Sequence, residues 1–177
     1  MLQVYNTLGR TLQPFQTRDE GKVGIYLCGP TVQSEPHVGH GRSAVAFDVI
    51  RRYLTWKGYD VTLVRNVTDI EDKIIKAAEE SGVPVDELAI TMAQKFREGY
   101  AALGIPDPDH EPKATESIAE IVGMIETLIE RGLAYEADGD VYFAVRALES
   151  YGKLAGHDPD GYLTVALQLS ATPFREA

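Results

Sequence analysis

Residues 23–40 read VGIYLCGPTVQSEPHVGH, and this stretch decides which fold the chain adopts. It opens with a short apolar run, breaks at Gly29-Pro30 and closes on two histidines. An apolar run of this length, bounded by glycine and proline, predicts a buried strand. Apolar residues then recur at helical spacing from Ser43 to Trp56, and Gly58 is a natural stop for that helix.

The same pattern returns further along the chain. A second apolar run, residues 61–64, predicts another strand, and helical spacing from Ile70 to Glu80 ends at Gly82. Strand, helix, strand and helix in that order indicate a parallel sheet joined by right-handed crossovers. We therefore expect an α/β fold in which residues 1–82 form the first half of a Rossmann-like, nucleotide-binding parallel sheet.

Two polar segments follow the predicted strands, residues 28–40 after the first and residues 66–72 after the second. In open parallel sheets, ligands bind beyond the carboxyl ends of the strands. We therefore expect both segments to line one crevice, which is the place to look for a functional site.

Residues 83–150 change in character and are predicted to be a connective insertion. Amphipathic helices are expected at residues 86–103 and 115–131, and an Asp138-Gly139 turn between two short apolar runs favours a β-hairpin. The second helix is expected to bury a stripe made of Ile118, Ile121, Val122, Ile125, Leu128 and Ile129. Residues 151–177 are interpreted as a divergent tail.

Composition narrows the class of protein. The chain has 177 residues, 44% of them hydrophobic, and no run near the ~18 apolar residues that span a membrane, so we expect no membrane association. Its single cysteine cannot form an internal disulfide, which favours a reducing cytoplasm. Residues 107–149 carry 11 acids and 3 bases. Because phosphate contacts need Lys and Arg, the chain alone is predicted to bind nucleic acid poorly.

The most informative motif is His37-Val38-Gly39-His40, at the turn from the first strand into its helix. A helix amino terminus presents unpaired N–H groups and a positive dipole end, so it binds phosphate readily. Two histidines three residues apart can donate hydrogen bonds to phosphate oxygens that gain charge during nucleotidyl transfer. Gly39 would let a nucleotide approach the backbone. The alternative is two surface histidines at a helix start, and the place of the motif after a punctuated strand favours the functional interpretation.

Cys28, at the end of the first strand, admits two interpretations. A lone buried cysteine is most often a small hydrophobic residue. Beside Gly29 and Thr31, a soft thiolate would also serve as a zinc ligand. One ligand does not make a site, so the residues by themselves do not justify a metal.

The segment Asn66-Val67-Thr68-Asp69 follows the second strand and also leaves two alternatives open. Thr68 and Asp69 are residue types that cap helices, so they would cap the helix that comes next. Contact with a substrate is about as well supported.

Several stretches of the chain together resemble one family, the cysteinyl-tRNA synthetases, in the same order and at the family spacing. The similarity runs from about residue 1 to about residue 157. The stretches are Tyr5–Leu8, Tyr26–Val32, His37–His40, Arg65–Lys73, Glu111–Thr115, Gly139–Phe143 and Tyr151–Leu154. The ligase that joins cysteine to a glucosamine–inositol in mycothiol synthesis is a close relative, and its pattern fits less well around residues 28–36.

The resemblance implies a class I fold that uses ATP to activate cysteine as cysteinyl-adenylate and then transfers it to tRNA. It implies that His37 and His40 are catalytic and bind the ATP phosphates together with Gly39. Gly29, Thr31 and Thr68 would contact the cysteine substrate, and Cys28 would be one ligand of a zinc ion that reads the substrate thiolate. A soft metal suits that task because size alone separates cysteine from serine poorly.

The resemblance also places several parts of the family pattern outside this chain. These are the other zinc ligands, the second half of the sheet, the lysine-bearing KMSKS loop and the anticodon-binding region, so tRNA would bind only through regions beyond the chain. We expect weak ATP binding and no activity from the chain alone. We also expect a second copy, another chain or the tail segment Tyr162–Leu169 to cover the open edge of the half sheet.

Two other functions remain as alternatives. A stand-alone half-synthetase would bind a nucleotide or a partner protein without aminoacylating anything. A small nucleotidyltransferase shares the histidine motif and the sheet, but such enzymes usually lack both the insertion at residues 83–150 and the rest of the motif series, which argues against this class.

Overall fold

The structure of the chain is a computed structural model that describes residues 2–156. Contacts divide it into two compact units. One unit comprises residues 17–120, and the other comprises the described residues of 1–16 and of the chain from residue 121 onward. The segment Tyr162–Leu169, predicted to cover a sheet edge, lies outside the described residues. The two units are taken in turn.

The first unit is built on a parallel pair of strands. β3 (Lys22–Leu27) pairs with β4 (Asp60–Arg65) in parallel, in a register that runs from Lys22↔Asp60 to Leu27↔Arg65. The crossover between them contains helix α1 (Val38–Trp56). The predicted alternation of strand and helix is confirmed, although each sheet of the described residues has only two named strands.

An extended segment that the sequence analysis did not predict runs beside β4. Residues 109–114 form parallel bridges at Val64↔His110 and Val67↔Lys113. The Val67 amide donates to the Pro112 carbonyl at 2.9 Å, and the Ala114 amide donates back to the Val67 carbonyl at 3.1 Å. The edge of β4 that faces away from β3 is therefore paired by this segment.

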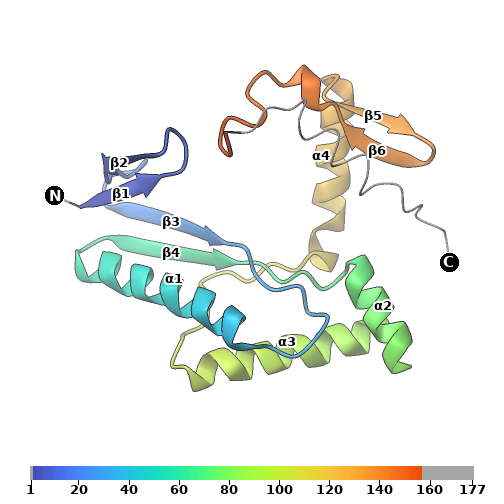
Figure 1. The fold of residues 1–177 in the computed structure, drawn as a ribbon, viewed down its shortest axis with the longest axis horizontal. Coiled ribbons are helices and arrows are strands. Elements are labelled where there is room, and N and C mark those ends of the chain that lie inside the picture. The colour runs from blue at the N-terminus through green and yellow to red at the C-terminus, as the bar shows by residue number, and fades with distance from the viewer. Residues whose placement is uncertain (1, 157–177) are drawn as a thin grey trace. The chain divides into compact units, whose positions relative to one another are not determined.

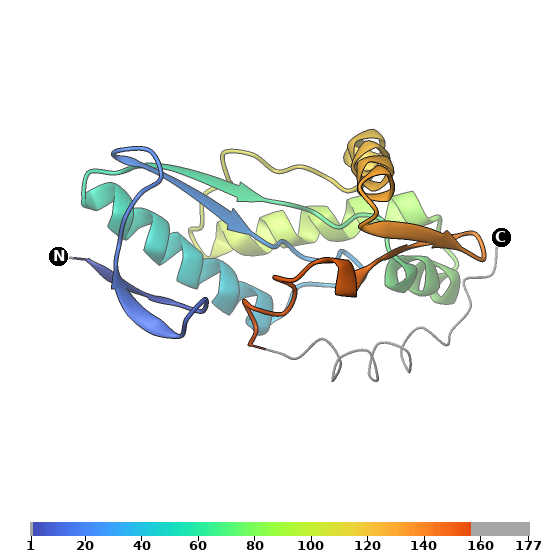
Figure 2. The same cartoon turned by 90° about the horizontal axis from the view of Figure 1, so that it is seen from above.

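Helices cover one face of the β3–β4 pair. α1 and α3 (Val85–Ala102) both lie on the same side of the two strands (Figures 1 and 2), and α2 (Asp72–Ser81) packs on α3. α2 ends as predicted at Gly82, which has a left-handed φ of 68°. On the opposite face of β3, the Tyr26 side chain is 66% exposed.

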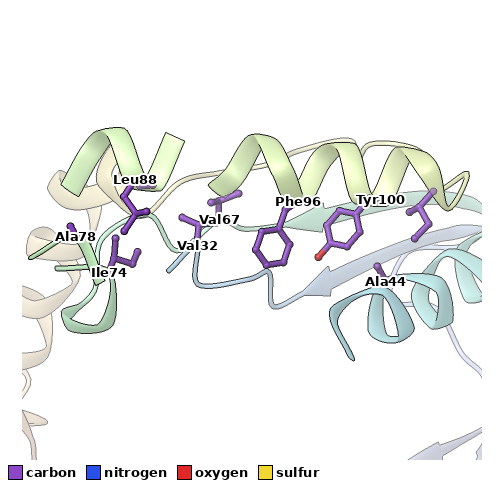
Figure 3. Close-up of a cluster of buried hydrophobic side chains, with 10 residues drawn as sticks. Val32, Ala44, Val67, Ile74, Ala78, Leu88, Phe96 and Tyr100 are labelled. Atoms are coloured by element: carbon purple, nitrogen blue, oxygen red, sulfur yellow. The ribbon is translucent and has the colours of Figure 1, made fainter. Parts of the chain in front are cut away.

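The core of this unit lies between α3, α2, α1 and the loops that leave the strands (Figure 3). α3 supplies the large aromatic members, and Val32 and Ile74 are fully buried. The cluster consists of Val32, Ala44, Val67, Ile74, Ala78, Leu88, Ala89, Phe96, Tyr100 and Ile105. Because α3 packs against the segments that follow both strands, it forms the floor of the region where a ligand would bind.

The second unit contains two antiparallel hairpins. β1 (Gln3–Asn6) pairs with β2 (Thr11–Pro14), and β5 (Ala134–Ala137) pairs with β6 (Asp140–Phe143). Asp138 and Gly139 have φ values of 54° and 88°, which suits the predicted tight turn and confirms the β5–β6 hairpin. A short 3-10 turn, η2 (Val145–Ala147), follows β6.

Helix α4 (Ile118–Glu130) follows a 3-10 turn, η1 (Thr115–Ser117), close to its predicted position. The predicted buried stripe is wrong, since no residue of α4 is buried. Ile118 and Val122 are each 47% exposed. Helical spacing marks an apolar face, but burial also needs an element packed closely on that face, and among the described residues only Ile125 and Leu128 of the stripe reach half-burial. No helix in the described range combines the length and apolar character needed to cross a membrane.

Candidate functional site

The two histidines of the predicted motif cap the amino terminus of α1. His37 is the N-cap residue, with φ −129° and ψ 172°, and its Nδ1 accepts a hydrogen bond from the Gly39 amide at 3.1 Å. The His37 amide donates in turn to Nδ1 of His40 at 3.2 Å. Each imidazole therefore satisfies one of the amide groups that a helix start leaves without a partner.

These two hydrogen bonds assign the tautomer of each ring. A neutral imidazole whose Nδ1 accepts a hydrogen bond carries its proton on Nε2. His37 and His40 therefore both present an Nε2–H donor, and their ring centroids lie 3.9 Å apart. Paired N–H donors at a helix start suit an anionic ligand such as phosphate.

Gly39 is required here by the cap itself. A Cβ at this position would lie 2.9 Å from Cε1 and 3.0 Å from Nδ1 of His37. Any other residue would push the His37 ring away from the amide it caps. The sequence analysis singled out this glycine for a different reason, the close approach of a nucleotide.

Helix α3 sets the environment of His40. The edge of its ring packs on Phe96, with centroids 4.9 Å apart and an interplanar angle of 70°. Burial lowers the pKa of His40 below its usual value, and the neighbouring His37 lowers it further. The neutral form that caps the helix is therefore favoured.

His40 shares a crevice with the end of β3. The crevice has a volume of about 70 Å³. Its lining residues are Leu27, Cys28, Gly29, Pro30, His40, Ser43, Ala44, Arg65 and Tyr100. The predicted convergence of His40 with Cys28 and Gly29 is thus present in the structure. His37 lines a different hollow of about 700 Å³, whose walls come from α1 and α3.

Thr31 and Thr68 lie side by side just beyond the two strand ends, although neither lines the crevice. The Thr68 amide donates to the Pro30 carbonyl at 3.1 Å, and the Val32 amide donates to the Thr68 carbonyl at 3.2 Å. The parallel pairing of β3 and β4 thus continues through the two loops and brings both predicted substrate contacts to the same edge.

Gly29 allows the loop after β3 to lie very close to the loop after β4. Its amide donates to Oδ1 of Asn66 at 2.8 Å, and a Cβ at Gly29 would lie 1.5 Å from the Asn66 carbonyl oxygen. No side chain fits there without moving one of the strands. The glycine therefore has a structural role in addition to the substrate contact predicted for it.

Asp69 does not cap α2, so this prediction is wrong. The N-cap of α2 is Glu71, which makes no side-chain capping bond. Asp69 instead accepts hydrogen bonds from the Thr115 amide at 3.0 Å and the Thr115 hydroxyl at 2.6 Å. Asp69 therefore fixes the start of η1. Its partner, Thr115, lies 46 residues away, so no local sequence pattern reveals the contact.

The sequence analysis missed the charged group beneath the crevice. Arg65 is 3% exposed, and its Nη2 donates to Oε1 of Glu111 at 3.0 Å. Its guanidinium lies over the Tyr100 ring, 4.5 Å from the centroid, and burial raises the pKa of that tyrosine. An arginine that ends an apolar strand is the one local signal that points to this group.

The residues described around Cys28 do not by themselves fit a zinc ion. Cys28 is exposed, so its interpretation as a buried hydrophobic residue is wrong. Within residues 2–156, no three His, Cys, Asp or Glu side chains gather closely enough to hold a metal. A structural or catalytic zinc site needs three or four protein ligands.

Comparison with known proteins decides the family. The family model described as tRNA synthetases class I (C) catalytic domain matches residues 14–170. The chain belongs to this family. This class I (C) synthetase chain is 50% identical to the cysteine–tRNA ligase of Vibrio vulnificus YJ016 over 161 residues. The alignment covers 90% of this chain and 35% of that protein. It is 46% identical to the cysteine–tRNA ligase of Bacillus pumilus over 165 residues. The chain spans about a third of the length of these curated relatives.

Solved structures agree with this class I assignment. Methionyl-tRNA synthetase of Mycobacterium tuberculosis, in complex with methionyl-adenylate, matches with a TM-score of 0.56 and 25% identity over 64% of this chain and 22% of that one. The LeuRS of Agrobacterium radiobacter, in a ternary complex with tRNA and LeuAMS, matches with a TM-score of 0.57 and 20% identity over 68% of this chain and 16% of that one. The second likeness concerns the fold alone.

Proposed function

We propose that the chain supplies the phosphate-binding and part of the amino-acid-binding machinery of a cysteine–tRNA ligase. The observation that carries this proposal is the pair of capping histidines at the start of α1, one of which shares a crevice with Cys28 and Gly29. The names of the relatives point to cysteine and tRNA as substrates, and ATP and tRNA(Cys) are proposed with them. Residues 1–82 are proposed as the nucleotide-binding half, residues 83–150 as the insertion and residues 151–177 as the tail.

In the proposed reaction, a carboxylate oxygen of cysteine attacks the α-phosphorus of ATP. The new O–P bond forms while the bond from the α-phosphorus to pyrophosphate breaks, and negative charge grows on the phosphate oxygens. The Nε2–H groups of His37 and His40, with the positive end of the α1 dipole behind them, donate to those oxygens. Both imidazoles act as neutral donors, so this step requires no proton transfer from them.

The amino acid is proposed to lie at the edge formed by Gly29, Thr31 and Thr68. Cys28 is proposed as one zinc ligand, the remaining ligands coming from outside the described residues. When bound, the metal would select the substrate thiolate over a hydroxyl. The acidic segment at residues 107–149 is unsuited to phosphate contacts, so tRNA is proposed to bind through other regions of the complete enzyme.

A second function, a binding module that docks on another protein, is favoured by one observation. Apolar side chains of α1 are exposed along one side of the helix, at three- and four-residue spacing. They are Val45 (39%), Val49 (59%), Tyr53 (43%) and Trp56 (76%). A surface of this kind typically marks an interface.

The proposed phosphate site is tested by calorimetric titration of ATP into the purified chain. In His37→Asn, the asparagine can still cap α1 but lacks the Nε2 donor. We expect it to lower ATP affinity about tenfold, the value of one charge-assisted hydrogen bond. His110→Ala, which removes an exposed imidazole outside the crevice, is the matched control and should leave affinity unchanged. Equal affinities in all three proteins would refute the site.

Activity of the chain alone is a separate test. We expect no measurable cysteine-dependent exchange of pyrophosphate into ATP, since the proposed enzyme is about three times longer than this chain. The zinc content of the same sample should be measured in parallel. Robust exchange by the isolated chain would overturn the view that the described residues form only part of the site.

A further inference from the structure

Arg65 is the only charged side chain that the described part of the chain buries. Burial of a guanidinium is strongly unfavourable unless its donors find partners. Arg65 stands at the carboxyl end of β4, directly opposite Leu27 in the parallel register. Its donors therefore have to be accounted for one by one.

Two partners account for part of the interactions that the Arg65 guanidinium needs. Nη2 donates to Oε1 of Glu111, and the guanidinium lies over Tyr100. The other oxygen of Glu111 accepts from Nη2 of Arg97 at 3.0 Å. One carboxylate is thus shared by two arginines, and the group carries a net charge of +1.

The Nε–H of Arg65 is buried and has no acceptor among residues 2–156. A buried donor without a partner is destabilising, so an acceptor is expected beside it. Arg65 lines the crevice that also contains Cys28 and His40, whose volume of about 70 Å³ is enough for a water molecule. Its stem packs under Gly29, since a Cβ there would lie 3.3 Å from Cγ of Arg65.

We infer that Arg65 is a positioning residue for the amino acid substrate. Its Nε–H holds an ordered water on the floor of the crevice, and that water hydrogen-bonds the polar end of cysteine. The net positive charge of the Arg65–Glu111–Arg97 group favours the carboxylate as the end that is held. The water is inferred from the structure alone, whereas the contact with cysteine rests on the proposed function.

The water is tested by NMR on the full chain labelled with ¹⁵N. The Arg65 Nε–H signal, assigned by its loss in Arg65→Met, should exchange with solvent at least about tenfold more slowly than that of Arg18, which is exposed. It should also show cross-relaxation to a bound water. Exchange as fast as that of Arg18, or no cross-relaxation to water, would overturn the inference.

Calorimetric titration with cysteine and, separately, with ATP tests the role of the water. Arg65→Met should weaken cysteine binding about tenfold and leave ATP binding within twofold, while Arg52→Met, the matched control at an arginine that bonds Asp48 and the Gly104 carbonyl outside the crevice, changes neither. Arg65→Lys keeps the charge without the Nε–H, so it should restore thermal stability but not cysteine affinity. Unchanged cysteine affinity in Arg65→Met, or restored affinity in Arg65→Lys, would contradict the inference.

Addition of cysteine should also shift the Arg65 Nε–H signal, which a purely structural role would not do. If the wild-type chain binds neither cysteine nor ATP, the proposed function fails. Cross-relaxation of the Nε–H to a bound water then decides the inference by itself, since its presence sustains the water and its absence removes it.

Discussion

At the scale of single residues, the site depends on which atom of each imidazole carries the proton. Nδ1 of His37 and of His40 accepts a backbone amide, so both rings hold their proton on Nε2 and keep it available for donation. The same atoms that start the helix therefore create the donors for an anion. In the proposed site, helix stability and phosphate binding are therefore coupled through these two rings.

This coupling predicts a pH dependence. Because burial and His37 lower the pKa of His40 in the folded chain, the unfolded state binds more protons, and stability should rise with pH. The contribution of His40 to the free energy of unfolding is complete above the usual histidine pKa near ~6.5. It is lost as pH falls through the lower pKa that His40 has in the folded chain, because protonated Nδ1 no longer accepts the His37 amide. Melting temperatures from pH 5 to 8 should show this trend in the wild type and a weaker one in His40→Gln. Identical profiles would contradict the capping role.

Gly29 gives a second prediction at this scale. Gly29→Ala places a methyl group 1.5 Å from the Asn66 carbonyl oxygen, so the β3 and β4 loops must separate, at a cost of roughly 1–3 kcal/mol. The control is Gly24→Ala on β3, where a Cβ meets nothing within 4 Å. Denaturant unfolding should show the loss for Gly29→Ala alone. Equal stability of the two variants would show that Gly29 and the Asn66 carbonyl are less closely packed than the structure indicates.

At the scale of elements, the long-range ties are the part that the sequence does not show. Apolar periodicity predicted β3, α1, β4 and α2 because each is a local pattern with a clear stop. The extended segment 109–114 was missed because Pro108 and Pro112 hide its strand character, although they leave enough amides to pair with β4. A helix cap was one of two alternatives for Asp69, and it is wrong because the partner of Asp69, Thr115, is near only in space.

The Asp69 contact predicts a local effect. Asp69→Ala removes both bonds to Thr115 and should cost about 1 kcal/mol. Hydrogen exchange should speed up at the Thr115 amide and in η1, while the amides of α2 keep their rates. Faster exchange throughout α2 would instead support the capping role that the sequence suggested.

At the scale of the candidate site, the sequence identified the residues that meet at the strand ends but not the floor beneath them. His40, Cys28 and Gly29 were recognised from motifs and do share a crevice. Phe96, Tyr100 and Glu111 come from a region expected to be an insertion, and nothing in their local sequence separates them from ordinary core and surface residues. Their role follows only from the packing of α3 against the strand ends.

At the scale of the whole molecule, the exposed apolar side of α1 predicts association. Val49 and Trp56 are 59% and 76% exposed, more than an isolated chain is expected to tolerate along one stripe. Sedimentation should show self-association that weakens in Trp56→Glu, with Lys57→Glu as the control for the added charge. A monomeric wild-type chain at high concentration would contradict this expectation.

The most direct test of the account is ¹⁵N NMR of the histidine side chains during a titration with ATP at pH 8. We predict that His37 and His40 are both Nε2–H tautomers before ATP is added, and that both Nε2 signals shift saturably as it binds, while that of His110 stays in place. Nδ1–H tautomers, or Nε2 signals that ignore ATP, would contradict the claim that these capping histidines bind phosphate.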